Sequence, residues 1–198
     1  MCLSLVGSEM CIRDSPYAYL AIDPIRRLLS EAGLIADWRP FVLDIPSYLG
    51  SAKLGKSGNV AEQNRSPEQW SGVKYAYFDC RRYANLRDVT VRGTVKIWDT
   101  NLVATTMFWV KQQESLAEQC KSDSLLMRFL DRVFVPFWKR ELDVESVAQM
   151  ELVLTDIGAS LDGFSDFLSG EGFKANQIFQ TECFNSGIYG VPTFVIPG

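Results

Sequence analysis

Ser15 and Pro16 stand where a helix is expected to begin, and a hydroxyl at such a place can stabilise an anion. Proline is favoured at the first position of a helix, and serine is favoured as the residue that caps it. The free N–H groups and the partial positive charge at a helix N-terminus both favour negative charge. Ser15 therefore has two interpretations: it activates a bound anion, or it is a helix cap alone.

The composition of the chain restricts the chemistry that is open to it. None of the 198 residues is histidine, which excludes Ser-His-Asp and Cys-His catalysis and argues against a transition-metal site, so we predict no bound metal. An odd number of cysteines without any Cys-x-x-Cys spacing favours a reducing, cytoplasmic location over a disulfide framework. The cysteines are Cys2, Cys11, Cys80, Cys120 and Cys183.

Charge and hydropathy argue against two classes of partner. The formal net charge of -4 argues against nucleic acid as the main partner. No run of 18 apolar residues is present, so we expect no membrane-spanning segment. Hydrophobic residues make up 47% of the chain, which is enough for a sizeable core in one globular unit or in a small domain with an insertion.

The elements around the Ser-Pro pair can be read from the apolar, proline and glycine positions. An apolar stripe indicates a helix over 16–32, closed by Gly33 as a favoured C-cap. A β-rich stretch over 34–44 follows, and Pro40 within it points to an edge position or an early end. The polar, glycine- and serine-rich residues 50–72 are typical of a binding loop.

Helices dominate the rest of the chain. Helical spacing predicts them over 73–85, 101–113, 123–142 and 144–158, with two shorter helices over 160–168 and 172–187. The last element, 190–196, is predicted to be a strand that is entered through an x-Pro bond. This order predicts an α/β fold in which an all-helical insertion over 45–187 divides a smaller core.

The two ends of the sequence differ from the remainder. Residues 1–14, MCLSLVGSEMCIRD, show no strand alternation, poor helical periodicity and no features of a secretory signal. We therefore expect a non-native segment of low order, or at best an imperfect substitute for a first strand. The abrupt end within GVPTFVIPG, 190–198, leads us to expect that native sequence is missing at both ends.

Four short motifs, in this order and spacing, resemble one family. They are SPYAYL at a helix start, DWRPFVL on the next strand, KSGN in the following loop and YGVPTFVI near the end. Together with DCRRYAN over 79–85, they resemble the 2-hydroxychromene-2-carboxylate isomerases, which are relatives of kappa-class glutathione transferases within the DsbA-like thioredoxin superfamily. The resemblance implies a thioredoxin-like core, 15–44 and 188–198, with the helical insertion between its parts. It also implies a cis peptide bond at Pro192 and pairing of 190–196 beside 35–43.

The resemblance further implies a glutathione-dependent reaction on a small-molecule substrate. The serine hydroxyl of Ser15 would bind the glutathione thiolate, which would add to a conjugated double bond of an aromatic-derived acid, allow rotation, and leave. Asn59, Lys74, Val191 and Pro192 would contact glutathione, and Tyr17 and Arg82 would contact the substrate. A homodimer is compatible with the resemblance.

Each of these assignments has an alternative. Asn59 suits an ordinary turn, Lys74 could face water, and the side chains of Arg81 and Arg82 diverge by ~100° on a helix, so at most one points inward. The other functional class is a DsbA-family binding protein, or an oxidoreductase that uses some other thiol. Dithiol exchange is disfavoured, because Ala18 cannot resolve a mixed disulfide.

Overall fold

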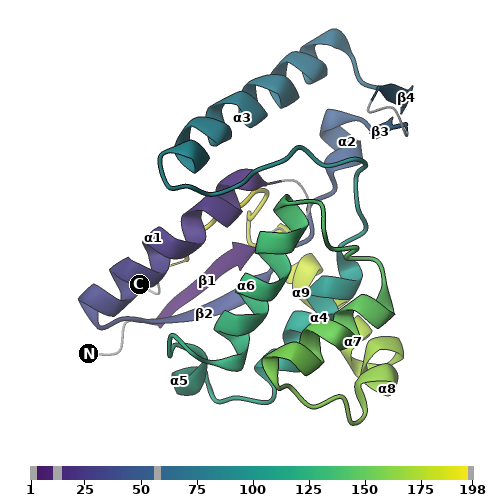
Figure 1. Cartoon of the computed structure of the whole chain (residues 1–198). Helices are drawn as coiled ribbons and strands as arrows, with labels where there is room; N and C mark the ends of the chain where they lie inside the picture. Colours follow the sequence, from purple (N-terminus) through teal and green to yellow (C-terminus); the bar gives the residue numbers. More distant parts are fainter. Residues whose placement is uncertain (1–3, 11–14, 56–58, 196–198) are drawn as a thin grey trace.

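Two parallel strands and the helix between them form the centre of the fold. The computed structural model describes residues 4–10, 15–55 and 59–195. Strands β1 (Ser4–Met10) and β2 (Ile35–Pro40) pair in parallel, and α1 (Pro16–Ala32) connects them. α1 lies along one side of this pair, and the helices formed by residues 101–185 lie along the other (Figure 1).

α1 begins and ends as its sequence predicts. Pro16 is the first helical residue, the Ser15 hydroxyl caps the helix, and Gly33 ends it in a left-handed conformation with a φ of 62°. Apolar residues on one face of α1 pack into the core, where Tyr19 stacks on Phe134 and Trp138 with ring centroids 5.8 and 6.2 Å apart. This packing fixes the direction in which the N-terminus of α1 points.

Part of the segment 1–14 forms a strand. Ser4–Met10 pair with β2, and the register shifts between Val6 and Glu9. A strand with an irregular register agrees with the expected imperfect substitute for a first strand and not with low order throughout. Residues 1–3 and 11–14 lie outside the described residues, and the prediction that the whole segment is non-native stays a prediction.

The helical insertion is present and contains most of the core. Its larger helices are α3 (Pro67–Asn85), α4 (Asn101–Lys111), α6 (Leu125–Trp138), α7 (Val147–Ile157) and α9 (Glu171–Asn185), with short helices α2 (Ile45–Leu49), α5 (Leu116–Gln119) and α8 (Phe164–Ser169). Phe129, Phe134 and Trp138 on α6 are fully buried at its centre. Within the described chain, no helix is both long and apolar enough to cross a membrane.

The predicted loop 50–72 is more ordered than its composition indicates. Strands β3 (Ala52–Leu54) and β4 (Val60–Gln63) form an antiparallel hairpin, and α3 begins at Pro67. Ser66 and Gln69 form a capping box, in which each side chain accepts a hydrogen bond from the backbone of the other residue. This Ser-Pro-Glu-Gln signal moves the start of the helix six residues earlier than predicted.

The predicted strand 190–196 was wrong over the part that the structure describes. Only Val195 forms a β-bridge, and residues 190–194 adopt bends and irregular structure. The predicted cis peptide bond between Val191 and Pro192 is confirmed. The segment still reaches the end of β2, because Val191 packs against the apolar cluster that contains Phe41 and Leu43.

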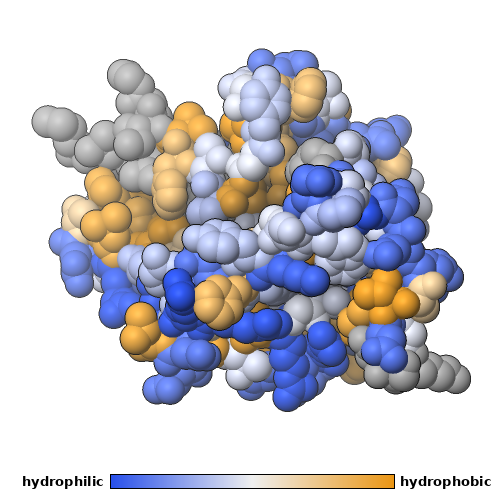
Figure 2. Space-filling model, turned by 90° about the horizontal axis from the view of Figure 1, so that it is seen from above, coloured by the Kyte–Doolittle hydropathy of each residue, from blue (hydrophilic) through white to orange (hydrophobic). Residues whose placement is uncertain are grey.

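α3 forms an outer layer above α1. Only Cys80 and Ala84 of its residues are fully buried, and Tyr75, Phe78 and Leu86 (which caps its C-terminus) are exposed. Figure 2 views the molecule from this side, and its hydrophobic side chains form separate patches between hydrophilic ones. Residues 86–100, which we call the strap, return beneath α3 without regular structure (Figure 1).

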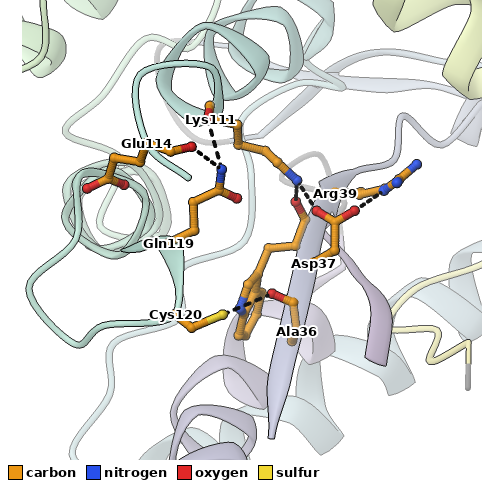
Figure 3. A network of polar contacts seen from close by, with 8 residues as sticks. Ala36, Asp37, Arg39, Lys111, Glu114, Gln119 and Cys120 are labelled. Carbon is orange, nitrogen blue, oxygen red and sulfur yellow. Dashed lines mark hydrogen bonds and ion pairs between the residues drawn. The ribbon is translucent and has the colours of Figure 1, made fainter. Parts of the chain in front are cut away.

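A partly buried ionic network joins β2 to α4 and α5 (Figure 3). The Lys111 ammonium contacts the Asp37 carboxylate and donates to the carbonyl oxygen of Trp38, while Arg39 Nε lies 2.6 Å from Asp37. Burial opposes ionisation of Asp37, but the attraction of Lys111 and Arg39 outweighs it and lowers the pKa of this carboxyl. Cys120 Sγ donates to the carbonyl oxygen of Ala36, 3.5 Å away, at the same edge.

Two helical glycines should respond in opposite ways to alanine. A Cβ on Gly172 would overlap the ring of Phe167, which is held against Trp109 with ring centroids 5.1 Å apart. We expect Gly172→Ala to lower the free energy of unfolding by about 1–3 kcal/mol. Gly72 has open space at its Cβ, so Gly72→Ala should raise that free energy by up to about 1 kcal/mol. Urea denaturation measures both, and equal effects would contradict the packing described here.

Candidate active site

Ser15 lies against the turn that contains the cis-proline, far away in the sequence. Its Oγ donates to the carbonyl oxygen of Val191 at 3.1 Å and accepts from the backbone N–H of Ala18 at 3.3 Å. The Ser15 side chain is buried, with the residue 8% exposed. A hydroxyl, a helix N-terminus and the backbone before a cis-proline therefore meet at one point.

A cavity of about 510 Å³ opens beside this point. Pro16, Ile45 and Ile97 line it. Ile45 is a member of the apolar cluster that Val191 contacts, and Ile97 packs against that cluster. The cavity lies between α3 on one side and the strap, α2 and β3 on the other. The remaining lining residues are Leu49, Ala52, Leu54, Arg65, Trp70, Gly72, Val73, Lys74, Ala76, Tyr77, Arg81, Gly93, Thr94, Val95, Lys96 and Arg140.

The charged residues along this cavity are all cationic. They are Arg65, Lys74, Arg81, Lys96 and Arg140, and no acidic residue of the described chain lines it. Most of the other lining side chains are apolar or aromatic. Such a combination suits a ligand with an apolar body and one or more negative charges.

Only some of the residues predicted to bind glutathione lie near Ser15 or the cavity. Val191 and Pro192 lie at Ser15, and Lys74 lines the cavity with its Nζ 5.9 Å from the centroid of the Trp70 ring. Asn59 lies apart from the cavity lining: it is exposed in the β3–β4 turn, where its carbonyl oxygen accepts from Gly55 N–H at 2.8 Å. The geometry thus gathers Ser15, the proline turn and Lys74, but not Asn59.

The two residues predicted to bind substrate lie outside the cavity lining. Tyr17 donates to the Asp79 carboxylate at 2.9 Å, which ties α1 to α3, and burial together with this hydrogen bond raises its pKa to about 12. Arg82 is exposed, with its guanidinium 4.5 Å from the centroid of the Phe78 ring. The other arginine of the doublet, Arg81, lines the cavity. Both residues are exposed, and at most one was predicted to point inward: Arg81 lines the cavity, and Arg82 does not.

Two of the protein's thiols, those of Cys80 and Cys120, are poorly suited to nucleophilic chemistry. Burial raises the pKa of Cys80 to about 11, and burial also raises the pKa of Cys120. At neutral pH both stay protonated, and a protonated thiol is a weak nucleophile. Neither of them lines the cavity.

Sequence reasoning missed several cavity residues. Arg65 and Trp70 stack, with the guanidinium 5.1 Å from the ring centroid, and the capping box that begins α3 could have placed Trp70 on its first turns. Arg140 has no such local signal. It follows the C-cap of α6 with a φ of 63°, a left-handed conformation in which glycine is the favoured residue.

Comparisons with known proteins agree with this architecture. No protein-family model matches the chain, and no curated protein matches it. It is similar to the solved structure of 2-hydroxychromene-2-carboxylate isomerase (HCCA isomerase), with a TM-score of 0.64 and 16% identity over 100% of this chain and 86% of that chain. A candidate protein disulfide isomerase from Nitrosomonas europaea gives a TM-score of 0.63 and 17% identity over 100% and 84% of the two chains. The chain therefore has a thioredoxin-like fold that is divided by a helical insertion.

Proposed function

We propose that this protein is a cytoplasmic enzyme that binds glutathione and uses it to isomerise, or to conjugate, a small acidic compound derived from an aromatic ring. The observation that carries the proposal is the meeting of Ser15 with the Val191–Pro192 turn. Thioredoxin-like oxidoreductases carry their active dithiol at the start of this helix. In this chain the same position carries the hydroxyl of Ser15 in place of a thiol.

The residues present fit glutathione in charge and size. Glutathione carries two carboxylates, one ammonium and a thiol, so its net charge is negative, and the cavity offers about 510 Å³ with cationic residues and no acidic ones among its described lining. When bound, glutathione would supply the sulfur nucleophile that adds to a carbon–carbon double bond and later leaves. Lys74 is the residue of this lining that we assign to a glutathione carboxylate.

The protein's own groups then have limited tasks. Ser15 would turn its hydroxyl from the Val191 carbonyl to the bound sulfur and hold it as a thiolate, and the N-terminus of α1 would add to this stabilisation. The apolar side chains of the cavity would exclude water around the reacting carbon. No group has to accept a proton in a pure isomerisation, which agrees with a chain without histidine.

One observation favours a second candidate, a thioredoxin-like binding protein without catalysis. The Ser15 hydroxyl already makes two hydrogen bonds, one as a helix cap and one to Val191. A serine so engaged can serve the fold alone. The similarity to a candidate disulfide isomerase is compatible with this alternative, since Ser15 and Ala18 rule out a dithiol at this position.

Thiolate formation on bound glutathione, together with turnover, separates the two candidates. We expect titration calorimetry to detect glutathione with a Kd in the micromolar to millimolar range, and ultraviolet difference spectra to show thiolate at neutral pH because the bound thiol has a lowered pKa. Lys74→Gln should weaken binding about threefold to tenfold, as expected for one charge-assisted contact. Isomerisation of 2-hydroxychromene-2-carboxylate is the turnover assay.

The control is S-methylglutathione, which keeps both carboxylates but cannot ionise at sulfur. It should bind through the same cationic residues and give no thiolate signal. Binding of glutathione without thiolate formation would favour the binding protein, and no binding of either compound would contradict the proposal.

A further inference from the structure

Arg81 and Arg140 approach the same short piece of the strap. Arg81 Nε donates to the carbonyl oxygen of Val91 at 3.2 Å, and its Nη2 lies 3.5 Å from the position that a Cβ on Gly93 would take. Arg140 Nε donates to the carbonyl oxygen of Gly93 at 2.6 Å. Two guanidinium groups from α3 and from the end of α6 therefore converge at Gly93.

Neither guanidinium has a carboxylate partner among the described residues. Lys96 of the same cavity pairs with Glu145 at 2.5 Å, but no ion pair within the described chain involves Arg81 or Arg140. Glu141 and Asp143 line a neighbouring hollow that Arg140 also borders, and neither lies within ion-pair distance of it. Both residues are exposed, so water screens the two charges, and a bound anion would meet two cationic donors without a competing carboxylate.

The backbone at Arg140 also indicates a role beyond the fold. A left-handed conformation costs a non-glycine residue of order 1 kcal/mol or more, and such strain is concentrated at functional sites. Glycine here would end α6 without this cost. The arginine instead extends its side chain to the strap and to the cavity.

The surroundings define the rest of the ligand. The Arg81 guanidinium lies 5.5 Å from the centroid of the Tyr77 ring, and Val95 and Ile97 line the cavity beside it. We propose that Arg81 and Arg140 form a subsite for the oxyanion headgroup of an aromatic ligand, whose ring lies against Tyr77 and the apolar strap residues. The identification of this ligand as the acidic substrate rests on the proposed function. The anion subsite itself does not depend on glutathione binding.

Two fluorescent probes with one skeleton test the subsite. They are 1-anilinonaphthalene-8-sulfonate, an aromatic anion, and N-phenyl-1-naphthylamine, its neutral parent. We expect the anion to bind more tightly, and Arg81→Gln and Arg140→Gln each to weaken it about threefold to tenfold while leaving the neutral probe unchanged. Arg82→Gln is the matched control, because it removes the neighbouring charge on α3 that lies outside the cavity lining.

Further measurements separate the subsite from a structural role and from the proposed function. Arg81→Lys and Arg140→Lys should recover part of the anion affinity, and all variants should keep their melting temperature within a few degrees. Glutathione affinity should fall less in Arg81→Gln than in Lys74→Gln, because only Lys74 is assigned to a glutathione carboxylate. If wild type fails to bind glutathione but still prefers the anionic probe, the subsite stands and the proposed function falls.

Three results would overturn the subsite. The first is equal binding of the two probes by wild type. The second is an equal loss of both probes in Arg81→Gln or Arg140→Gln, which would indicate that the cavity has collapsed. The third is an effect of Arg82→Gln on the anion as large as that of Arg81→Gln.

Discussion

Ser15→Ala should reduce turnover at neutral pH by about tenfold to a hundredfold. The variant loses one hydrogen bond to a charged sulfur, which is worth roughly 1.5–3 kcal/mol, and the rate falls accordingly. The pKa of bound glutathione should rise in the same variant, because its thiolate is less stabilised. Rates over a range of pH and ultraviolet titration of the bound thiol measure the two effects.

Ser124→Ala is a closely matched control. Ser124 is also a buried N-cap serine, and its Oγ accepts from Met127 N–H at 3.1 Å and donates to the carbonyl oxygen of Gln119 at 3.1 Å. Both alanine variants should lose about 1 kcal/mol of stability through the missing cap. Only Ser15→Ala should lose activity. Equal activity in the two variants would reduce Ser15 to a helix cap and favour the binding protein.

Asp37→Ala should lower the free energy of unfolding by about 3–5 kcal/mol. The substitution leaves the Lys111 ammonium, whose side chain is only 14% exposed, at β2 with only the Trp38 carbonyl and the more distant surroundings to compensate it. Replacing both partners, as in Asp37→Leu with Lys111→Met, should recover most of this loss. Asp156→Ala is the control, because it removes an exposed ion pair with Arg132 and should cost at most about 1 kcal/mol.

The same carboxylate makes stability depend on pH. Its pKa in the folded protein lies below the ordinary 3.8, so the folded state holds fewer protons there than the unfolded state. The stabilisation is complete above pH 3.8 and is lost as the pH falls through the lower value of the folded protein. Denaturation curves between pH 5 and 2 should therefore show a steeper decline for wild type than for Asp37→Ala. Parallel curves would contradict the ionic network.

Local signals in the sequence predicted the elements that carry their own boundaries. Pro16 and Gly33 mark the ends of α1, and the helical spacing of the insertion needs no distant partner to be recognised. The segment 190–196 failed as a strand because a strand forms only where another strand pairs with it. The hairpin of β3 and β4 was missed for a related reason. Its strands are only three and four residues long, which is too short for a clear alternating pattern, and they form because they pair with each other.

The candidate site was predicted in part. Ser15 and Pro192 could be brought together through the resemblance, but the choice between Arg81 and Arg82 depends on the rotation of α3 about its axis, which the polar sequence of that helix does not determine. Arg140 could not be found, because Lys-Arg-Glu gives no sign of a left-handed residue. Its place in the cavity follows from how α6 ends against the strap.

The shallow packing of α3 has a consequence for how the molecule opens. With two fully buried residues and contacts mainly to α1 and α2, this helix can separate from the body while α4 and α6 stay folded. Its amides should then exchange with deuterated solvent through a partial opening, faster than those of the central helices. A ligand bound beneath α3 would oppose that opening by RT ln(1 + [L]/Kd). Deuterium uptake along α3 should therefore decrease as the fraction of protein with ligand in the cavity increases.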